Sequence, residues 1–135
     1  MIAKPVPLEF AAQTWDLVVP HIQEAMKYGG GDYTIDQIKL FVLMGQWLLI
    51  AVVDDENQIH GACTVSFINY PNSRVAFVTA IGGRLISSKE TFKQLCEIVK
   101  ARGATKIQGA TRESIARLWR RYGFKERYTT VEYKL

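Results

Sequence analysis

The residues best suited to chemistry lie together in the last third of the chain. Arg84 and Lys89 flank two serines, Ser87 and Ser88, directly before an amphipathic run that indicates a helix. The N-terminus of a helix attracts anions, because its first N–H groups have no partner within the helix and its dipole is positive at that end. These four residues therefore predict a binding site for a phosphate or another anion.

The same stretch has a simpler structural interpretation. Ser87 and Glu90 have the spacing of a capping box. In this motif the two side chains accept hydrogen bonds from backbone N–H groups at the start of the helix. Those N–H groups would then be unavailable to a ligand. The sequence leaves the anion site and the plain capped helix as alternatives.

Length and composition predict a single domain over residues 1–135. A chain of 135 residues with 48% hydrophobic side chains can bury one core and is too short for two. No apolar run approaches the roughly 20 residues of a membrane span, and the first residues lack the apolar core of a signal peptide. We therefore expect a cytoplasmic protein without a membrane partner. The two cysteines, Cys63 and Cys96, lack the spacing of a metal site and are expected to be buried apolar residues.

Charge divides the chain into two opposite halves. Residues 1–83 contain four Lys and Arg against eight Asp and Glu, whereas residues 84–135 contain thirteen against five. The net charges are therefore −4 and +8. A basic half of this kind suits an anionic partner, and the candidates are nucleic acid, an acidic protein surface or a phosphorylated cofactor.

Hydrophobic periodicity predicts a sheet with helices on its faces, in the order β-α-α-β-β-β-α-β-α-β. Strands are expected at residues 6–8, 47–53, 58–69, 74–81 and 106–108, with a terminal strand near residues 128–134. Helices are expected at residues 10–28, 34–44, 87–102 and 112–122. Pro20 must start or kink the first helix, whereas Thr34 and Gln37 have the capping-box form that starts the second.

The order of helix, strand, helix, Gly-Phe and strand in residues 87–135 resembles the acyl-CoA-binding half of the GNAT superfamily of N-acetyltransferases. Residues 101–107 resemble the end of its central helix and the start of its fifth strand, and residues 118–124 resemble its helix that ends in Gly-Phe. A strand, the acidic turn at residues 54–57 and Gly61 in the following strand together resemble its second and third strands. The likeness covers essentially the whole chain and implies an α/β (α+β) fold: a mixed, mostly antiparallel central sheet with helices on both faces. More narrowly, the chain is similar to small, divergent members encoded by tailed phages and prophages.

The resemblance implies an N-acyltransferase that uses acetyl-CoA and an amine. Family members hold the CoA pyrophosphate with an R/Q-x-x-G-x-G/A loop, which falls here on residues 84–89. Arg84 matches the first position, but Ser87 and Lys89 replace the glycines, so the loop departs from the pattern. Backbone groups of three residues in the preceding strand are implied to contact the pantetheine arm. They are Val78, Thr79 and Ala80.

The usual catalytic acid is also replaced. In the family pattern N-x-x-A-x-x-x-Y-x-x-x-G-F, the tyrosine that protonates the departing thiolate corresponds to Trp119, which is no acid. Tyr122 lies three residues further along nearly the same helix face and becomes the candidate acid. The strands expected to flank the acyl site contain no Asp or Glu, which leaves three polar candidates for a general base. These are His60, Tyr70 and Tyr33.

Two functions from different classes remain open. The first is the transferase. The second is a non-catalytic GNAT-like protein, a phage accessory or virion-associated factor, whose basic helix at residues 112–121 contacts an acidic protein partner. Nucleic-acid binding is the weakest option, because helical spacing directs Ile115 and Trp119 toward the sheet and away from a ligand. The sequence also leaves room for a homodimer.

Overall fold

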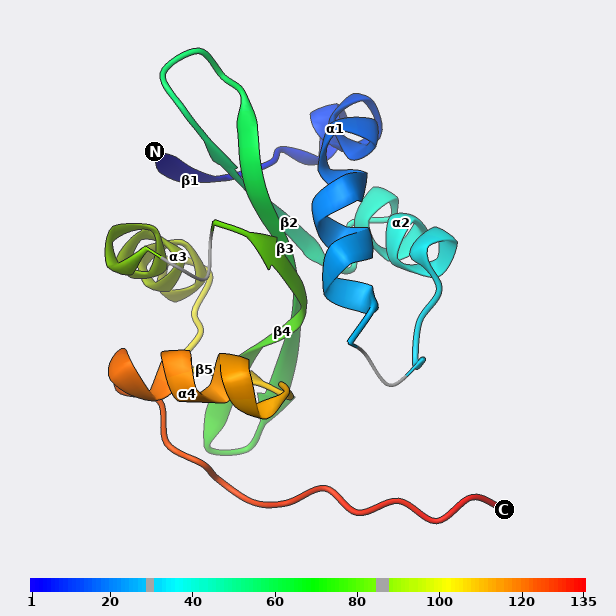
Figure 1. Ribbon diagram of the computed structural model, residues 1–135, viewed down its shortest axis with the longest axis vertical. Helices are drawn as coiled ribbons and strands as arrows, with labels where there is room; N and C mark the ends of the chain where they lie inside the picture. Colours follow the sequence, from blue (N-terminus) through cyan, green and yellow to red (C-terminus); the bar gives the residue numbers. More distant parts are fainter. Residues whose placement is uncertain (29–30, 85–87) are drawn as a thin grey trace.

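The computed structural model describes residues 1–28, 31–84 and 88–135, and Figure 1 shows a curved sheet between two pairs of helices. The strands are β1 (Ile2–Pro5), β2 (Leu48–Val53), β3 (Ile59–Tyr70), β4 (Ser73–Gly83) and β5 (Lys106–Gly109). The helices are α1 (Leu8–Met26), α2 (Ile35–Leu43), α3 (Lys89–Ala101) and α4 (Glu113–Arg121).

The sheet has the order β1-β2-β3-β4-β5, and all neighbours are antiparallel except the parallel pair β4 and β5. Helices α1 and α2 cover one face, and α3 and α4 cover the other (Figure 1). The predicted fold class, a mixed and mostly antiparallel sheet with helices on both faces, is confirmed.

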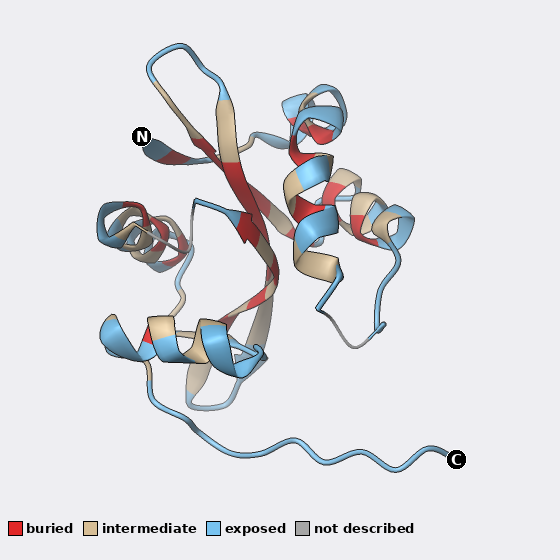
Figure 2. Cartoon of the chain, viewed as in Figure 1, coloured by how far each residue is buried: buried red, intermediate tan, exposed pale blue. Residues whose placement is uncertain are grey.

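Helices cover both faces of the sheet, and the middle of β2 and β3, residues 49–52 and 61–65, is buried (Figure 2). Side chains of a strand alternate between the two faces. Ile50, Val52 and Cys63 therefore pack toward α3 and α4, whereas Leu49 and Ala51 pack toward α1 and α2. Two apolar layers of this kind fix the register of each strand, because a slip by one residue would exchange the faces.

Several local signals of the sequence are confirmed. The Thr34 hydroxyl accepts a hydrogen bond from the backbone N–H of Gln37 at 3.2 Å. The side-chain oxygen of Gln37 accepts one from the backbone N–H of Thr34 at 2.9 Å. Together they form the predicted capping box. Pro20 lies inside α1, which begins at Leu8, so a helix that starts at Pro20 is wrong and the kink there stays a prediction. The predicted strand at residues 6–8 is displaced, because β1 occupies Ile2–Pro5 and Leu8 already begins α1.

The predicted terminal strand near residues 128–134 is wrong. Residues 125–135 form no regular element and are all exposed. In Figure 1 this segment runs below α4, and its end lies outside the body of the molecule. A strand needs a neighbour to pair its backbone groups, and none of the described strands of this chain lies against it.

Within the described residues, no helix combines the length and the apolar character that crossing a membrane requires.

Candidate active site between β4 and β5

The site begins where two parallel strands separate. Strands β4 and β5 pair from Val75 with Lys106 to Val78 with Gly109, and the pairing stops there. Strand β4 continues to Gly83, whereas the chain after Gly109 turns into α4. Residues 79–83 of β4 therefore have β3 as a neighbour on one side and, among the described residues, no strand on the other.

A β-bulge lies at this point of β4. Thr64 pairs with Ala80 and Val65 pairs with Val78, so Thr79 is the extra residue. Its hydroxyl donates to the Thr64 carbonyl oxygen at 3.0 Å and lies 2.8 Å from the Thr64 hydroxyl. A bulge bends the strand and redirects its backbone groups, and this one does so where β4 loses its second neighbour.

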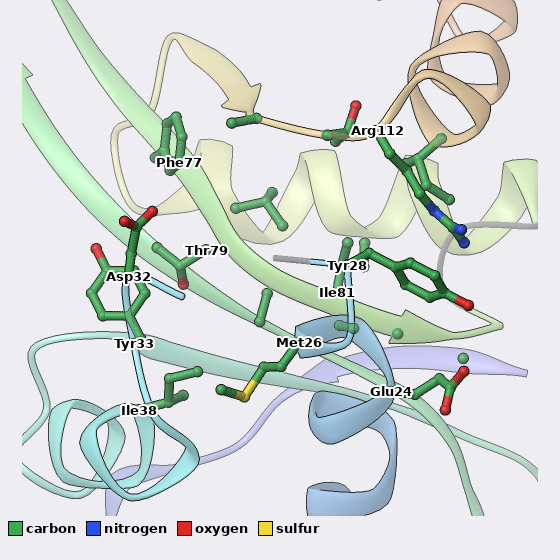
Figure 3. Close-up of a pocket in the computed structure, with 18 of the residues that line it drawn as sticks. Glu24, Met26, Tyr28, Asp32, Tyr33, Ile38, Phe77, Thr79, Ile81 and Arg112 are labelled. Atoms are coloured by element: carbon green, nitrogen blue, oxygen red, sulfur yellow. The ribbon is translucent and has the colours of Figure 1, made fainter. Parts of the chain in front are cut away.

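A cavity of about 720 Å³ opens against this stretch (Figure 3). One wall is β4 from Phe77 to Gly83, and a second is the end of α1 with the loop into α2. The third wall is the turn from β5 into α4, with Trp119 from the helix itself. The cavity thus lies between elements from both ends of the sequence, held together by the sheet.

Glycines allow these walls to approach closely. A Cβ at Gly82 would lie 2.1 Å from the backbone oxygen of His21, so the end of β4 packs directly on α1. A Cβ at Gly109 would lie 2.7 Å from the Trp119 ring, so the end of β5 packs directly on α4. Gly83 has a φ of +74°, a conformation that other residues rarely adopt.

Two carboxylates enter the cavity from the α1 side. Glu24 belongs to α1, Asp32 lies in the loop between α1 and α2, and both line the cavity (Figure 3). Glu24 also pairs with Lys27 at 2.8 Å. The sequence analysis missed these residues because it considered acids on the strands only, whereas Glu24 lies on a helix and Asp32 in the loop after it.

A cation, Arg112 at the start of α4, also lines the cavity. The Arg112 guanidinium lies 3.6 Å from the centre of the Tyr28 ring, which joins the start of α4 to the end of α1 (Figure 3). Tyr33 also lines the cavity, and its ring is held by an edge contact with Trp47 at 4.9 Å.

The structure brings three of the predicted cofactor residues to the cavity, since Val78, Thr79 and Ala80 all line it. Ser88 is the N-cap of α3 and accepts from the Thr91 amide at 3.3 Å. The helix therefore begins one residue later than a Ser87–Glu90 capping box requires. The predicted site residue Ser87 lies outside the described residues.

Arg84 and Lys89 stand on either side of the undescribed stretch at residues 85–87. Arg84 follows β4, and its amide donates to the His60 carbonyl oxygen at 2.9 Å. Lys89 is the first residue of α3. Both are exposed, so two cations lie at the end of β4 and at the positive end of a helix.

The structure does not bring the residues predicted as acid and base together at the large cavity. Trp119, in the position of the usual acid, is 6% exposed and stacks on Phe124 at 4.8 Å. Tyr122 stacks on Phe92 at 5.0 Å and lines a small adjacent cavity of about 10 Å³, but is not among the residues that line the large one. Trp119 lines both cavities and lies between them in the wall.

Of the three polar candidates for a base, only Tyr33 lines the large cavity. His60 instead contacts Asp54 at 2.7 Å in the β2–β3 hairpin. This hydrogen bond, together with the backbone amides of Gln58 and Glu56, holds the pKa of the Asp54 carboxyl below its usual value.

The cysteines have no role at this site. Cys63 is buried in the sheet, and burial raises the pKa of its thiol to about 12. Cys96 is half-buried on α3. Among the described residues, no group of three or more His, Cys, Asp or Glu side chains could hold a metal ion.

Comparisons with known proteins establish the fold at the level of structure. In sequence, the chain matches no protein-family model and none of the curated proteins. Its structure is similar to that of a probable acetyltransferase, with a TM-score of 0.72 and 14% identity over 100% of this chain and 97% of the other.

Two further structures show the same likeness. A predicted acetyltransferase with acetyl-CoA from Clostridium acetobutylicum has a TM-score of 0.67 and 13% identity over 98% of this chain and 94% of that one. A ribosomal-protein-alanine N-acetyltransferase from Brucella melitensis biovar Abortus has a TM-score of 0.67 and 11% identity over 100% of both chains. The chain therefore has a GNAT-like fold.

Proposed function

We propose that this protein binds a CoA thioester, acetyl-CoA, along β4 and transfers its acyl group to an amine. The observation that carries this proposal is the separation of β4 and β5 after Val78 and Gly109, with a cavity of about 720 Å³ against the unpaired part of β4. An extended ligand binds such an edge by hydrogen bonding to its backbone, as an added strand does. The acetyltransferase structures with the same fold, one of them described with acetyl-CoA, support this assignment.

The pantetheine arm would lie along Val78, Thr79 and Ala80. It carries amide groups that need backbone partners, and after Val78, where the pairing with β5 ends, β4 has no described strand beside it on the side away from β3. Ile115 and Trp119 line the same cavity and would provide an apolar surface beside the thioester. The chain thus supplies both the polar edge and the apolar wall that an acyl thioester requires.

The phosphate groups would lie at the start of α3. Arg84 and Lys89 provide charge, and Ser88 with the neighbouring Ser87 provides hydroxyl groups. The Ser88 hydroxyl accepts the hydrogen bond of the Thr91 backbone N–H, so this N–H is not available to phosphate. The helix dipole is unaffected by this cap. The missing glycines of the family loop reduce the contact of the backbone with phosphate, so we expect charge to contribute more of the affinity here than in a glycine-rich loop.

The amine would enter beside Glu24 and Asp32. An amine is a cation at neutral pH, and the two exposed carboxylates at the rim of the cavity attract it, although Glu24 shares its charge with Lys27. The bound thioester would supply an activated acyl carbon. The ammonium loses one proton to become the nucleophile, the carbon–nitrogen bond forms as the carbon–sulfur bond breaks, and the nitrogen then loses a second proton while the thiolate gains one. Glu24 and Asp32 are the groups of the cavity that can accept the first proton, directly or through water.

Tyr122 is our candidate for the group that protonates the thiolate. It lines the small cavity next to Trp119 and not the large one, so its hydroxyl has to reach the thiolate from that neighbouring cavity. Tyr122→Phe removes one oxygen and keeps the stack on Phe92. If Tyr122 is the acid, this change should lower turnover by roughly 10² to 10⁴ and leave acetyl-CoA binding unchanged. Equal turnover in the two proteins would contradict this role.

The function itself is tested by release of free thiol from acetyl-CoA in the presence of a panel of amines. Asp32→Asn and Glu24→Gln should each raise the KM for the amine, because they remove a charge and keep the shape of the side chain. Glu97→Gln, on the exposed face of α3, is the matched control and should change neither KM nor kcat. A parent protein that neither binds acetyl-CoA nor releases thiol with any amine would contradict the transferase.

That outcome would favour the non-catalytic alternative, an accessory protein whose basic helix contacts an acidic partner. Two arginines of this helix are already engaged within the chain, since Arg112 stacks on Tyr28 and Arg120 pairs with Glu113 and Glu126. We therefore place the transferase first. A phage origin and a cytoplasmic location stay predictions from the sequence.

A further inference from the structure

The charged residues that line the large cavity differ in whether their charge is already balanced. Among the residues that the structure describes, they are Glu24, Asp32 and Arg112. Glu24 pairs with Lys27 at 2.8 Å, so these two side chains together carry no net charge. Neither Asp32 nor Arg112 forms an ion pair within the described part of the chain. The cavity therefore has one unbalanced anion and one unbalanced cation.

The Arg112 side chain is held in place without being neutralised. Its guanidinium carbon lies 3.6 Å from the centre of the Tyr28 ring, which is contact distance for two flat groups that face each other. Stacking of this kind uses the face of the guanidinium and leaves the N–H groups along its edge available for hydrogen bonds. Such an edge binds a carboxylate through two parallel hydrogen bonds. Arg112 is therefore suited to bind an anionic group of a ligand.

The two unbalanced charges lie at different ends of the cavity. Figure 3 shows Asp32 on the left, and Arg112 and Glu24 on the right. Because Lys27 neutralises Glu24, the right-hand end has a net positive charge from Arg112. The left-hand end has the negative charge of Asp32. A ligand that matches this field carries a cation at one end and an anion at the other.

We propose that the amine acceptor is an ω-amino acid, an aliphatic chain with a primary amine at one end and a carboxylate at the other. This inference rests on the proposed transferase and names its substrate class. The ammonium would lie at Asp32 and the carboxylate at Arg112. Three apolar side chains of the same cavity would contact the aliphatic chain between them. They are Met26, Ile38 and Ile81.

Other amines match these charges less well. A diamine would place its second ammonium beside the Arg112 guanidinium, and like charges repel. A phosphate monoester carries a charge of about −1.5 to −2 at pH 7, which the single net positive charge at this end does not balance. An α-amino acid holds both charged groups on one carbon atom, so it does not reach both ends of the cavity.

A series of matched acceptors tests the proposal with the full chain and acetyl-CoA. For each chain length from propyl to hexyl, the alkylamine, the diamine and the ω-amino acid are compared by release of free thiol. At the best chain length, kcat/KM for the ω-amino acid should exceed that for the alkylamine and the diamine by about tenfold or more, because one charge-assisted contact is added.

Substitutions separate the two ends of the acceptor. Arg112→Gln should raise KM for the ω-amino acid by about tenfold and change KM for the alkylamine by less than about threefold. Arg112→Lys keeps the charge and loses the planar fork, so its KM for the ω-amino acid should lie between those of the parent and Arg112→Gln. Asp32→Asn should raise KM for both acceptors. Arg117→Gln is the matched control, because Arg117 is exposed on α4 and does not line the cavity.

Equal kcat/KM for the three classes of acceptor, or a preference for the diamine, would overturn this inference and leave the transferase standing. Weaker acetyl-CoA binding by Arg112→Gln in calorimetry would assign Arg112 to the cofactor and would also overturn it. If the parent releases no thiol with any amine, the transferase fails, and calorimetry with the ω-amino acids still tests the site. Binding that is lost in Arg112→Gln and kept in Arg117→Gln would support the site, whereas no binding by the parent would refute it.

Discussion

The fit of Gly109 against Trp119 allows a quantitative test of how α4 packs on the sheet. A Cβ at position 109 would lie 2.7 Å from Cζ3 and 2.9 Å from Cη2 of the Trp119 ring. Carbon atoms in contact normally lie about 3.5–4.0 Å apart, so either the ring or the strand has to move. The ring is 6% exposed and stacked on Phe124, which leaves it little room. Gly109→Ala should therefore cost about 1–3 kcal/mol of unfolding free energy.

The Trp119→Ala background shows whether the cost of Gly109→Ala comes from overlap with the Trp119 ring or from the backbone conformation of the glycine. Removing a buried indole should cost about 3–5 kcal/mol of unfolding free energy. In that background the overlap is gone, so adding Gly109→Ala should change the stability by less than about 0.5 kcal/mol. The two substitutions should therefore be coupled by about 1–3 kcal/mol, with the double variant more stable than the sum of the single changes indicates.

Urea unfolding followed by circular dichroism measures all four proteins without relying on tryptophan fluorescence. The same cost of Gly109→Ala in both backgrounds would refute the packing argument, because the glycine would then be needed for its backbone alone. A Trp119→Ala variant as stable as the parent would show that Trp119 is not a core residue. The second result would also remove Trp119 as the wall of the proposed acyl site.

Two further predictions concern charge. Replacing Arg84 and Lys89 together by Ala should weaken acetyl-CoA binding by about 1–3 kcal/mol if they contact phosphate, and calorimetry with unchanged affinity would remove them from the site. The Asp54 carboxyl, whose pKa is lowered chiefly by the hydrogen bond from His60, should stabilise the fold above its usual pKa of 3.8 and lose this effect as the pH falls below that value. Asp54→Asn should therefore lower the unfolding midpoint at pH 6 and have little effect near pH 2, with Asp55→Asn as the control; equal loss at both pH values would contradict the assignment.

The fold was predictable because its signals are local. The Thr34–Gln37 capping box, the apolar alternation of β3 and the acidic hairpin turn each depend on residues close in sequence. The terminal strand was also a local signal, and its alternation of Val131 and Tyr133 is real, but a strand forms only where an edge is available. The sequence of a single chain does not say where that edge lies.

The site was less predictable because it depends on long-range geometry. The bulge at Thr79 appears only when β3 and β4 are placed in register. Glu24 and Asp32 reach the cavity through the packing of α1 on the end of β4, which Gly82 permits. Val78, Thr79 and Ala80, in contrast, were placed by the family resemblance, and the structure brings all three to the cavity.

The most direct test of the central claim is isothermal titration calorimetry of acetyl-CoA with the parent and two matched variants. Thr111→Trp introduces an indole into the wall of the large cavity, whereas Ser114→Trp places the same side chain nearby on α4, outside the residues that line it. The account predicts one acetyl-CoA bound per chain in the parent and in Ser114→Trp, and binding weakened at least tenfold in Thr111→Trp. No binding by the parent, or equal binding by all three proteins, would contradict an acyl-CoA site between β4 and β5.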